Sequence, residues 1–330
     1  RRNIAYMEDG RWRASYDPLP QPASVIHHGG SRPHEGALTF DDGPDPDWTP
    51  RILDILKKKK VFATFFVVGE KAESEPELIR RILAEGHELG NHTFTHPNLS
   101  QSSDGQIRLE LNATRRLIEG LSGRSLILFR PPYNADSNPQ TPAELQPLKI
   151  ARQLGYLTIG QSVDSRDWER PNPESIFDAV KEGRARGQTI LFHDGGGDRE
   201  ATVEALPKVI DYLRSRGDQP VTVGTMLGMS PAETMPLLSP EKSPLAWLSQ
   251  TVFWLWRVLE KSLGTLLVLT TSLLALRMVT VWWGSLGRAP GWQLKSPRGI
   301  SVVLPAFNEE RSEEHTSELQ SRVDISYAVF

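Results

Sequence analysis

Short apolar runs alternate with amphipathic stretches between Gly36 and about Gly228. The apolar runs predict strands at 37–40, 62–68, 88–91, 126–129, 157–159, 189–192 and 221–223. Helical spacing of apolar positions between them predicts helices at 50–59, 76–85, 104–121, 143–154, 173–186 and 203–216. A repeated strand-then-helix order is typical of a parallel sheet or barrel. About seven strands in roughly 190 residues favour an α/β barrel over a small open sheet.

The segments on either side of this predicted domain have a different composition. Residues 1–35 are polar and interrupted by prolines, which predicts a linker or the tail of an upstream domain. Residues 229–250 are rich in proline and serine and are predicted to be a second linker. The pattern therefore predicts one domain at 36–228 with a linker on each side.

A long apolar run follows at 251–284 and predicts a juxtamembrane and transmembrane helix. In its last 23 residues the only charged residue is Arg277, and this length is enough to span a bilayer. Trp282 and Trp283 fit the aromatic belt at a membrane interface. The basic residues after the run predict a cytoplasmic C-terminal side, so the preceding domain would face outward from the cytoplasmic membrane. The alternative is a buried helix of a soluble protein.

Composition and charge narrow the chemistry that this chain can perform. The net charge of −3 and the pI near 6.3 give no indication of nucleic-acid binding. The absence of cysteine excludes disulfides, thiolate catalysis and cysteine-ligated zinc. Any metal must therefore be bound by His, Asp or Glu. Nothing in the pattern indicates an oligomeric state.

Polar side chains with candidate chemistry follow the first and third predicted strands. Asp41 and Asp42 come directly after the first strand, before a Gly-Pro turn. His92 and His96 come after the third strand, and their spacing of four lets both rings project to one side of a turn. Two imidazoles and one carboxylate leave open positions for water and substrate, which is the arrangement that catalytic zinc needs. Taken alone, each segment has an alternative, an acidic turn or a chance histidine pair.

Three further candidate segments, at 130–133, 164–168 and 191–193, also follow predicted strands. Arg130 could orient a carboxylate through paired hydrogen bonds. For the three segments in turn, the alternatives to a catalytic role are a surface arginine, a capped loop with a packed tryptophan, and a core histidine. Active sites of α/β barrels gather at the C-terminal ends of the strands. Five such segments at strand ends in one domain therefore predict one active site.

In this order the five segments resemble the motifs of the carbohydrate esterase family 4 polysaccharide deacetylases. The matching residues are Thr-Phe-Asp-Asp-Gly-Pro at 39–44, His-Thr-x-x-His at 92–96, Arg-x-Pro-Tyr at 130–133, Asp-x-x-Asp-Trp at 164–168 and Leu-x-His at 191–193. The resemblance covers roughly residues 36–228. It implies a distorted (β/α)7 barrel, in line with the number of predicted strands.

The resemblance also implies catalytic roles. Asp41 is expected to be the general base, held in place by Arg130. His193 is expected to be the general acid, with Asp164 as the carboxylate that raises its pKa. The backbone N–H of Tyr133 is expected to stabilise the oxyanion.

The remaining matching residues are expected to bind metal or substrate. The metal ligands are Asp42, His92 and His96, for zinc, with cobalt or nickel as substitutes. The substrate contacts are Trp168, Leu191 and Pro132. The implied reaction is hydrolytic N-deacetylation of a β-linked N-acetylglucosamine polymer or oligomer, either chitin-like, poly-N-acetylglucosamine or peptidoglycan. A carbohydrate-binding module without turnover is an alternative, which the intact Asp41 and His193 argue against.

A second resemblance lies in the region 285–310, after the predicted span. The segment Gly-Ile-Ser-Val-Val-Leu-Pro-Ala-Phe-Asn-Glu-Glu at 299–310 resembles the first strand of family 2 glycosyltransferases. It implies a membrane-bound fusion, and an alternative function in which a glycosyltransferase polymerises the sugar and the deacetylase edits it. Residues 311–330 show no periodicity and are interpreted as translated sequencing-adapter DNA.

Overall fold

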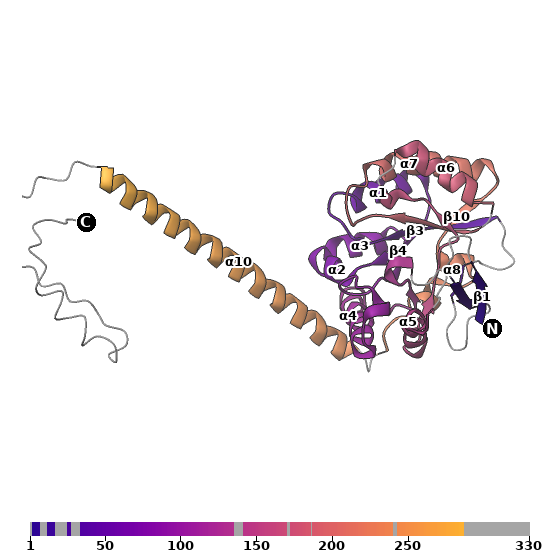
Figure 1. Cartoon of the computed structure of the whole chain (residues 1–330), viewed down its shortest axis with the longest axis horizontal. Coiled ribbons are helices and arrows are strands. Elements are labelled where there is room, and N and C mark those ends of the chain that lie inside the picture. The colour runs from indigo at the N-terminus through magenta and orange to yellow at the C-terminus, as the bar shows by residue number, and fades with distance from the viewer. Residues whose placement is uncertain are drawn as a thin grey trace, which may run out of the picture. The chain divides into compact units, whose positions relative to one another are not determined.

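A computed structural model describes residues 2–6, 12–16, 25–27, 34–134, 141–169, 172–185, 187–239 and 243–286. The chain divides into two compact units, Arg1–Leu263 and Gly264–Phe330. The predicted α/β domain lies in the first unit, and the helix α10 (Ser243–Leu286) continues from the first unit into the second (Figure 1). Of the predicted glycosyltransferase start, only residues 285 and 286 are described, as the end of α10, and 311–330 lie outside the described residues.

A curled sheet of eight parallel strands forms the centre of the first unit. Its order is β7-β6-β5-β4-β3-β9-β8, and β10 pairs with the first half of β3. The strands are β3 (Glu35–Asp41), β4 (Thr64–Val67), β5 (Glu88–Asn91), β6 (Leu128–Phe129), β7 (Leu157–Thr158), β8 (Val163–Asp164), β9 (Thr189–His193) and β10 (Gln219–Val221).

The sheet is a half-barrel, because its two outermost strands, β7 and β8, do not pair with each other. Residues 159–162 alone connect them, whereas neighbouring parallel strands need a crossover of about a dozen residues or more. The predicted (β/α)7 barrel is therefore confirmed as a curled parallel α/β sheet, and the opening between β7 and β8 is its distortion. The sequence did not predict β8 as a strand, because Val163 stands alone among polar residues, whereas apolar runs surround the equally short β6 and β7.

Part of the segment predicted as a linker at 1–35 extends the β7 side of this opening. Ile26 forms a parallel bridge with Ile159. The N–H of Ile26 donates to the carbonyl of Thr158 (2.9 Å), and the N–H of Gly160 donates to the carbonyl of Ile26 (2.9 Å). Further upstream, β1 (Arg2–Tyr6) and β2 (Trp12–Tyr16) form an antiparallel pair. Ile26 is thus hydrogen-bonded to the edge of the domain, inside the range that was predicted as a linker.

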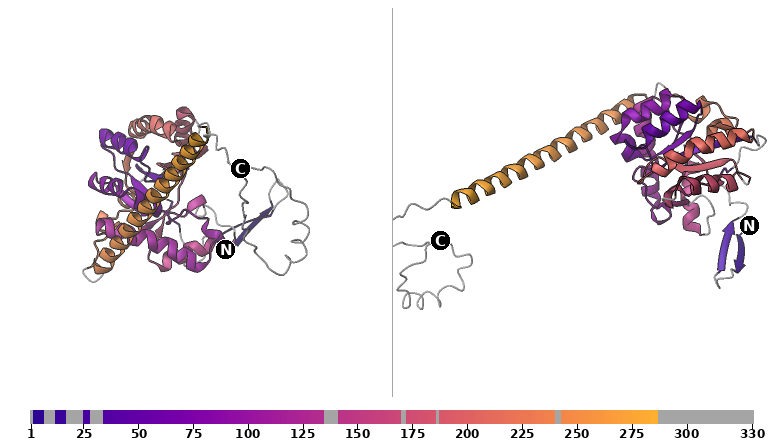
Figure 2. Two further views of the ribbon diagram at one scale, coloured as in Figure 1. Left: turned by 90° about the vertical axis from the view of Figure 1, so that its left-hand side faces the viewer. Right: turned by 90° about the horizontal axis from the view of Figure 1, so that it is seen from above.

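The larger helices lie on the outer side of the sheet (Figure 2). They are α1 (Thr49–Lys59), α2 (Gly69–Ser74), α3 (Pro76–Ala84), α4 (Asp104–Ser122), α5 (Pro142–Gln153), α6 (Pro173–Gly183) and α7 (Glu200–Ser215). Two helices of four residues follow, α8 (Val223–Met226), which packs against the inner face of the sheet, and α9 (Pro231–Thr234). Local sequence sets their ends. Ser103 and Gln106 form a capping box at the start of α4, and Gly123 ends that helix with φ 67°.

The core fixes β3 between its two neighbours. The ring of Phe40 stacks on Phe65 of β4 at 5.0 Å between centroids and on Phe192 of β9 at 5.7 Å. All three rings are fully buried. The register that this packing supports places Asp41 opposite His193, so the last residues of β3 and β9 lie side by side.

The structured domain continues past the predicted boundary at Gly228. Met235 is buried in the core, and the Thr234 hydroxyl donates to Glu88 Oε1 at 2.7 Å. The N–H of Leu238 donates to the carbonyl of Gly123 at 3.0 Å. The predicted linker from 229 therefore begins as packed structure. Because α9 has only four residues, it leaves no helical periodicity in the sequence.

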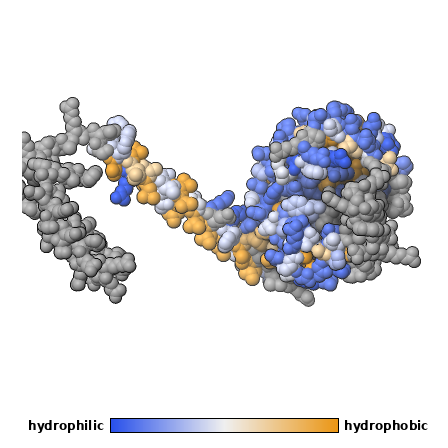
Figure 3. Space-filling view, in the orientation of Figure 1, coloured by the Kyte–Doolittle hydropathy of each residue, from blue (hydrophilic) through white to orange (hydrophobic). Residues whose placement is uncertain are grey.

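The apolar run in α10 has the length and composition of a membrane span. Residues Thr251–Gly284 have a mean hydropathy of 1.7. They contain an 18-residue window that is apolar enough to span a membrane, and no residue of that window is buried. Apolar side chains gather along α10, whereas the visible described surface of the first unit is mainly hydrophilic (Figure 3).

Candidate active site

The predicted site residues converge because they come from the C-terminal ends of neighbouring parallel strands. Asp41 and His193 end β3 and β9, while His92 and Arg130 each lie one residue beyond β5 and β6. A cavity of about 420 Å³ opens at this edge of the sheet, and nine of the eleven predicted site residues line it. The exceptions are Asp164 and Pro132.

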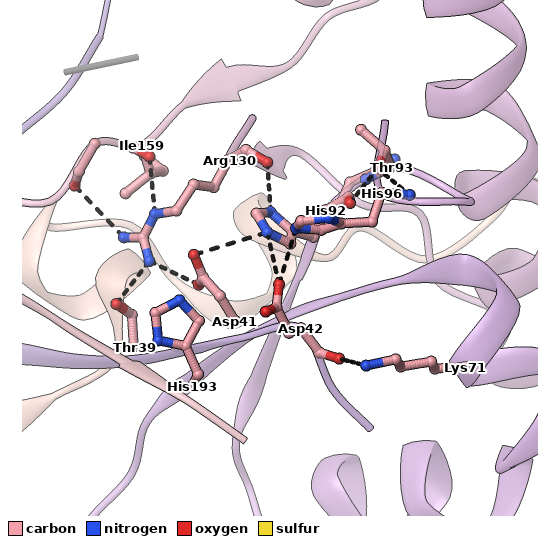
Figure 4. A network of polar contacts seen from close by, with 12 residues as sticks. Thr39, Asp41, Asp42, Lys71, His92, Thr93, His96, Arg130, Ile159 and His193 are labelled. Atoms are coloured by element: carbon pink, nitrogen blue, oxygen red, sulfur yellow. Dashed lines mark hydrogen bonds and ion pairs between the residues drawn. The ribbon is translucent and has the colours of Figure 1, made fainter. Parts of the chain in front are cut away.

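Three side chains point their donor atoms at one place in this cavity (Figure 4). Asp42 Oδ1 lies 3.3 Å from His92 Nε2 and 3.0 Å from His96 Nε2, and the three candidate ligand atoms lie within 4.8 Å of one another. His92 Nδ1 lies 2.8 Å from the carbonyl oxygen of Arg130 and donates to it, which directs Nε2 at Asp42 and leaves Nε2 as the candidate metal ligand. These donors fit a divalent cation with three protein ligands.

The charges at this point favour a bound cation. Burial alone would raise the pKa of Asp42, but hydrogen bonds from His92 and His96 and the positive charges of His92 and His193 hold it far below its usual range. Burial would lower the pKa of His92, and the neighbouring Asp41 and Asp42 reverse this and raise it. Asp42 Oδ1 is also buried without a well-aligned hydrogen bond. A metal ion would satisfy this oxygen and replace the proton that the carboxylates attract.

The glycine of the Gly-Pro turn after the two aspartates is required because the side chain of Asp194 packs directly against it. A Cβ at Gly43 would lie 2.2 Å from Asp194 Oδ2, which no other residue could tolerate. The turn also holds Asp42 at φ 71°, and Lys71 Nζ donates to the Asp42 carbonyl at 2.6 Å. The motif therefore fixes the direction of the Asp42 side chain.

Arg130 holds Asp41 in a buried ion pair. Its Nη1 donates to Asp41 Oδ1 and to Thr39 Oγ1, both at 2.8 Å, and its Nε donates to the carbonyl of Ile159 at 3.2 Å. The guanidinium also lies over the ring of Phe66 at 4.2 Å. The contact between Arg130 and Asp41 is the one that the sequence predicted.

The partner of His193 is Asp167, which corrects the prediction of Asp164. His193 Nδ1 lies 2.7 Å from Asp167 Oδ1, and the His193 backbone N–H donates to Asp167 Oδ2 at 2.8 Å. Asp164 instead accepts from the N–H of Arg166 at 2.8 Å and from Trp168 Nε1 at 3.5 Å. The 3₁₀ turn at Asp167–Glu169, after β8, brings the second aspartate of Asp-x-x-Asp-Trp toward β9.

This pairing keeps His193 protonated. Burial alone would lower the pKa of His193, but its hydrogen bond to Asp167 and the charges of Asp167, Asp41 and Asp42 raise it to about 9. Asp167 is almost fully buried, and its pKa is lowered against the effect of burial by His193 and Arg199. The ring is therefore an imidazolium at neutral pH, with Nε2 free to donate.

Two residues that the sequence did not indicate support Asp167. Arg199 Nη1 donates to the Asp167 carbonyl at 3.1 Å, and its Nε donates to the Gly195 carbonyl at 2.8 Å. The Thr202 hydroxyl donates to Asp167 Oδ2 at 2.9 Å. Arg199 also lines the cavity. Both residues lie at the start of α7, beyond the five motifs, so no motif marked them.

Aromatic side chains form the open side of the cavity. Tyr133 has φ 60° and is 66% exposed, and its ring contacts His96 at 4.9 Å. Trp168 is 50% exposed, whereas Leu191 lines the cavity as a buried side chain. Pro132 is buried away from the cavity, and its neighbour Pro131 lines it instead. The predicted contact of Pro132 with substrate is therefore not supported.

Comparison with known proteins shows the same fold and family over this domain. The family described as "Polysaccharide deacetylase" matches residues 29–159. The "Peptidoglycan-N-acetylglucosamine deacetylase" of Bacillus cereus is 40% identical over 195 residues, which are 58% of this chain and 87% of that protein. The "Chitooligosaccharide deacetylase" of Sinorhizobium fredii is 40% identical over 191 residues, 54% of this chain and 86% of that protein.

Solved structures agree on the fold. The Bc1960 peptidoglycan N-acetylglucosamine deacetylase matches with a TM-score of 0.58 and 36% identity over 63% of this chain and 94% of that one. A CE4 family pseudoenzyme from Bacillus anthracis matches with a TM-score of 0.56 and 31% identity over 63% of this chain and 70% of that one. Since active and inactive proteins share the fold, the side chains of the cavity have to decide the question of activity.

Proposed function

This chain belongs to the carbohydrate esterase family 4 polysaccharide deacetylases, and from this premise we propose that its cavity hydrolyses the N-acetyl group of N-acetylglucosamine units in a polysaccharide or oligosaccharide. One observation carries the proposal. A candidate metal triad, a carboxylate held by a buried arginine and a histidine held by a buried aspartate all face one cavity. An acetamide needs all three, because both the amide carbonyl and water are unreactive.

We propose zinc as the metal of Asp42, His92 and His96, with cobalt or nickel as substitutes. When bound there, the cation would polarise the acetyl carbonyl and lower the pKa of a water molecule. Nitrogen and oxygen donors of this kind suit all three metals.

The proton transfers fall to Asp41 and His193. Asp41 Oδ1 is engaged by Arg130, which leaves Oδ2 to accept the proton of the attacking water. His193 Nδ1 is engaged by Asp167, so its Nε2 donates a proton to the amide nitrogen as the C–N bond breaks. The backbone N–H of Tyr133 is the proposed donor to the oxyanion. The products are acetate and a free amine on the sugar.

The substrate class is the N-acetylglucosamine unit. The similar proteins are named for peptidoglycan and for chitooligosaccharides, and N-acetylglucosamine is common to both. The half-exposed Trp168 and Tyr133 flank the cavity and offer apolar faces to a sugar ring.

Acetate release tests this function directly. We expect the zinc-loaded protein to release acetate from chitooligosaccharides, poly-N-acetylglucosamine or peptidoglycan. Chelation should abolish release, and added zinc should restore it. Asp42→Ala and His96→Ala should release none. Full acetate release by a folded double variant, or none by the wild type on all three substrates, would refute the proposal.

We also propose that the protein is held in the cytoplasmic membrane with the deacetylase domain facing outward. The length and apolarity of Thr251–Gly284 and the basic residues after it support this. Protease added to intact spheroplasts should digest the domain, and complete protection would contradict the orientation. The synthase alternative gains no support from the described residues, because 299–310 lie outside them. The fusion stays a prediction, which sequencing of the complete gene would test.

A further inference from the structure

The short loop between the two histidine ligands, residues 93–95, is held by a side chain from another element. Glu110 of α4 accepts the N–H groups of Phe94 (2.7 Å) and Thr95 (2.8 Å) on Oε2. Its Oε1 accepts the Thr95 hydroxyl at 2.7 Å. Three donors from two successive loop residues therefore converge on one carboxylate, and hydrogen bonds to an ionised acceptor are stronger than neutral ones.

The backbone on both sides of these contacts needs support. Thr93 has φ 70° and His96 has φ 58°, in the left-handed region that side chains with a Cβ disfavour. Asn91 Oδ1 accepts the Thr93 N–H at 2.8 Å, and Thr93 Oγ1 accepts the His96 N–H at 3.1 Å. Such a conformation persists only where the surrounding contacts outweigh its cost.

Apolar packing holds the middle of the same loop. The ring of Phe94 lies so close to Gly69 that a Cβ there would be 2.3 Å from it. On another side the ring of Phe253 stacks on Phe94 at 6.1 Å between centroids. The ring of Phe94 is thus fixed by packing. The N–H groups of Gly69 and Glu70 in α2 donate to the carbonyls of Thr93 and Phe94, both at 2.9 Å, and Glu110 accepts the N–H groups on the other side of the loop backbone.

We propose that Glu110 is a positioning residue for the metal centre, a role that rests on the function proposed above. By tying Phe94 and Thr95 to α4, it holds the His96 ring where Nε2 meets Asp42 and His92. Glu110 is not among the residues that line the cavity, so it acts through the loop. Loss of a group that orients a metal ligand typically weakens metal binding by about 10–100-fold.

Zinc affinity, measured by competition with a chromophoric chelator and without any polysaccharide, tests this role. We expect Glu110→Ala to weaken zinc binding by about 10–100-fold and to alter the visible spectrum of the cobalt-loaded protein. Glu110→Gln should recover most of the affinity, because its amide oxygen still accepts both N–H groups and the Thr95 hydroxyl can turn to accept. Glu182→Ala, which removes an exposed glutamate from α6, is the matched control and should bind zinc like the wild type.

Unchanged zinc affinity and an unchanged cobalt spectrum in folded Glu110→Ala would overturn the proposal. If that variant does not fold, Glu110→Asp replaces it, since the shorter side chain cannot reach both N–H groups. Wild-type zinc affinity in Glu110→Asp would overturn the proposal equally. Because these measurements need no turnover, a protein that binds zinc through this loop but releases no acetate would refute the proposed function alone.

Discussion

Replacement of Asp167 by Asn should remove the partner that keeps His193 protonated. Asp167 Oδ1 lies 2.7 Å from His193 Nδ1, and the pKa of His193 is raised to about 9 from an ordinary value of 6.5. This difference corresponds to roughly 3 kcal/mol in favour of the imidazolium. Asp41 and Asp42 contribute to it, but the hydrogen bond and charge of Asp167 are its largest favourable causes. Without them, burial should bring the pKa of His193 down to its ordinary value or below it.

The raised pKa of His193 determines how kcat should depend on pH. A raised pKa keeps the acid form of His193 present at neutral pH, and that form is lost as the pH rises through the pKa. In Asp167→Asn the acid form should already be scarce at pH 8, so we expect kcat there to fall by about 30-fold or more. Asp164→Asn should lose less than about tenfold, because Asp164 bonds Arg166 and Trp168 and not the histidine.

An NMR titration of the His193 ring in metal-free protein measures the pKa, and acetate release as a function of pH measures the change in kcat. We expect the pKa of His193 near 9 in the wild type and in Asp164→Asn, and clearly lower in Asp167→Asn. An unchanged pKa in folded Asp167→Asn, or a larger loss of kcat in Asp164→Asn, would refute the assignment of Asp167.

Two further predictions concern stability. Met235→Ala should lower the free energy of unfolding by about 2–5 kcal/mol in urea titrations, because Met235 is 4% exposed in the core. A negligible change would mean that the domain ends before α9. Burial lowers the pKa of His87 to about 4 from 6.5, so the unfolded chain binds more protons and stability should fall, by up to ~3 kcal/mol, as the pH drops through this window. His87→Asn keeps an acceptor for the Ala63 N–H, and its stability should depend less on pH there; an identical pH dependence would contradict a neutral His87.

The sequence predicted those parts of the site that occupy strand ends. Asp41, His92, Arg130 and His193 each directly follow a strand that the sequence predicted, and the parallel sheet then brings them together. The choice between Asp164 and Asp167 could not be made in this way. It depends on a 3₁₀ turn after a strand of two residues, and neither element has a periodicity.

Support from distant segments was also beyond the sequence. Arg199 contacts Asp167, which lies 32 residues earlier in the chain. Glu110 contacts the 93–95 loop from the second turn of α4. Both are charged residues on or beside helices, where a solvated side chain is the ordinary expectation. The burial of Met235 was hidden for a related reason, since a Pro- and Ser-rich segment reads as a linker unless its contacts are known.

The central claim is that the cavity uses Asp41 as a base to hydrolyse an N-acetyl group. The most direct measurement is a paired quantification of acetate and free amine from a chitooligosaccharide by zinc-loaded wild type and by Asp41→Asn. The substitution keeps the shape of the side chain and an acceptor for Arg130, so zinc binding should persist. We predict equal amounts of acetate and amine from the wild type, and a loss of at least about 100-fold in Asp41→Asn. Wild-type rates in a folded, zinc-loaded Asp41→Asn, or acetate without an equal amount of amine, would contradict the account.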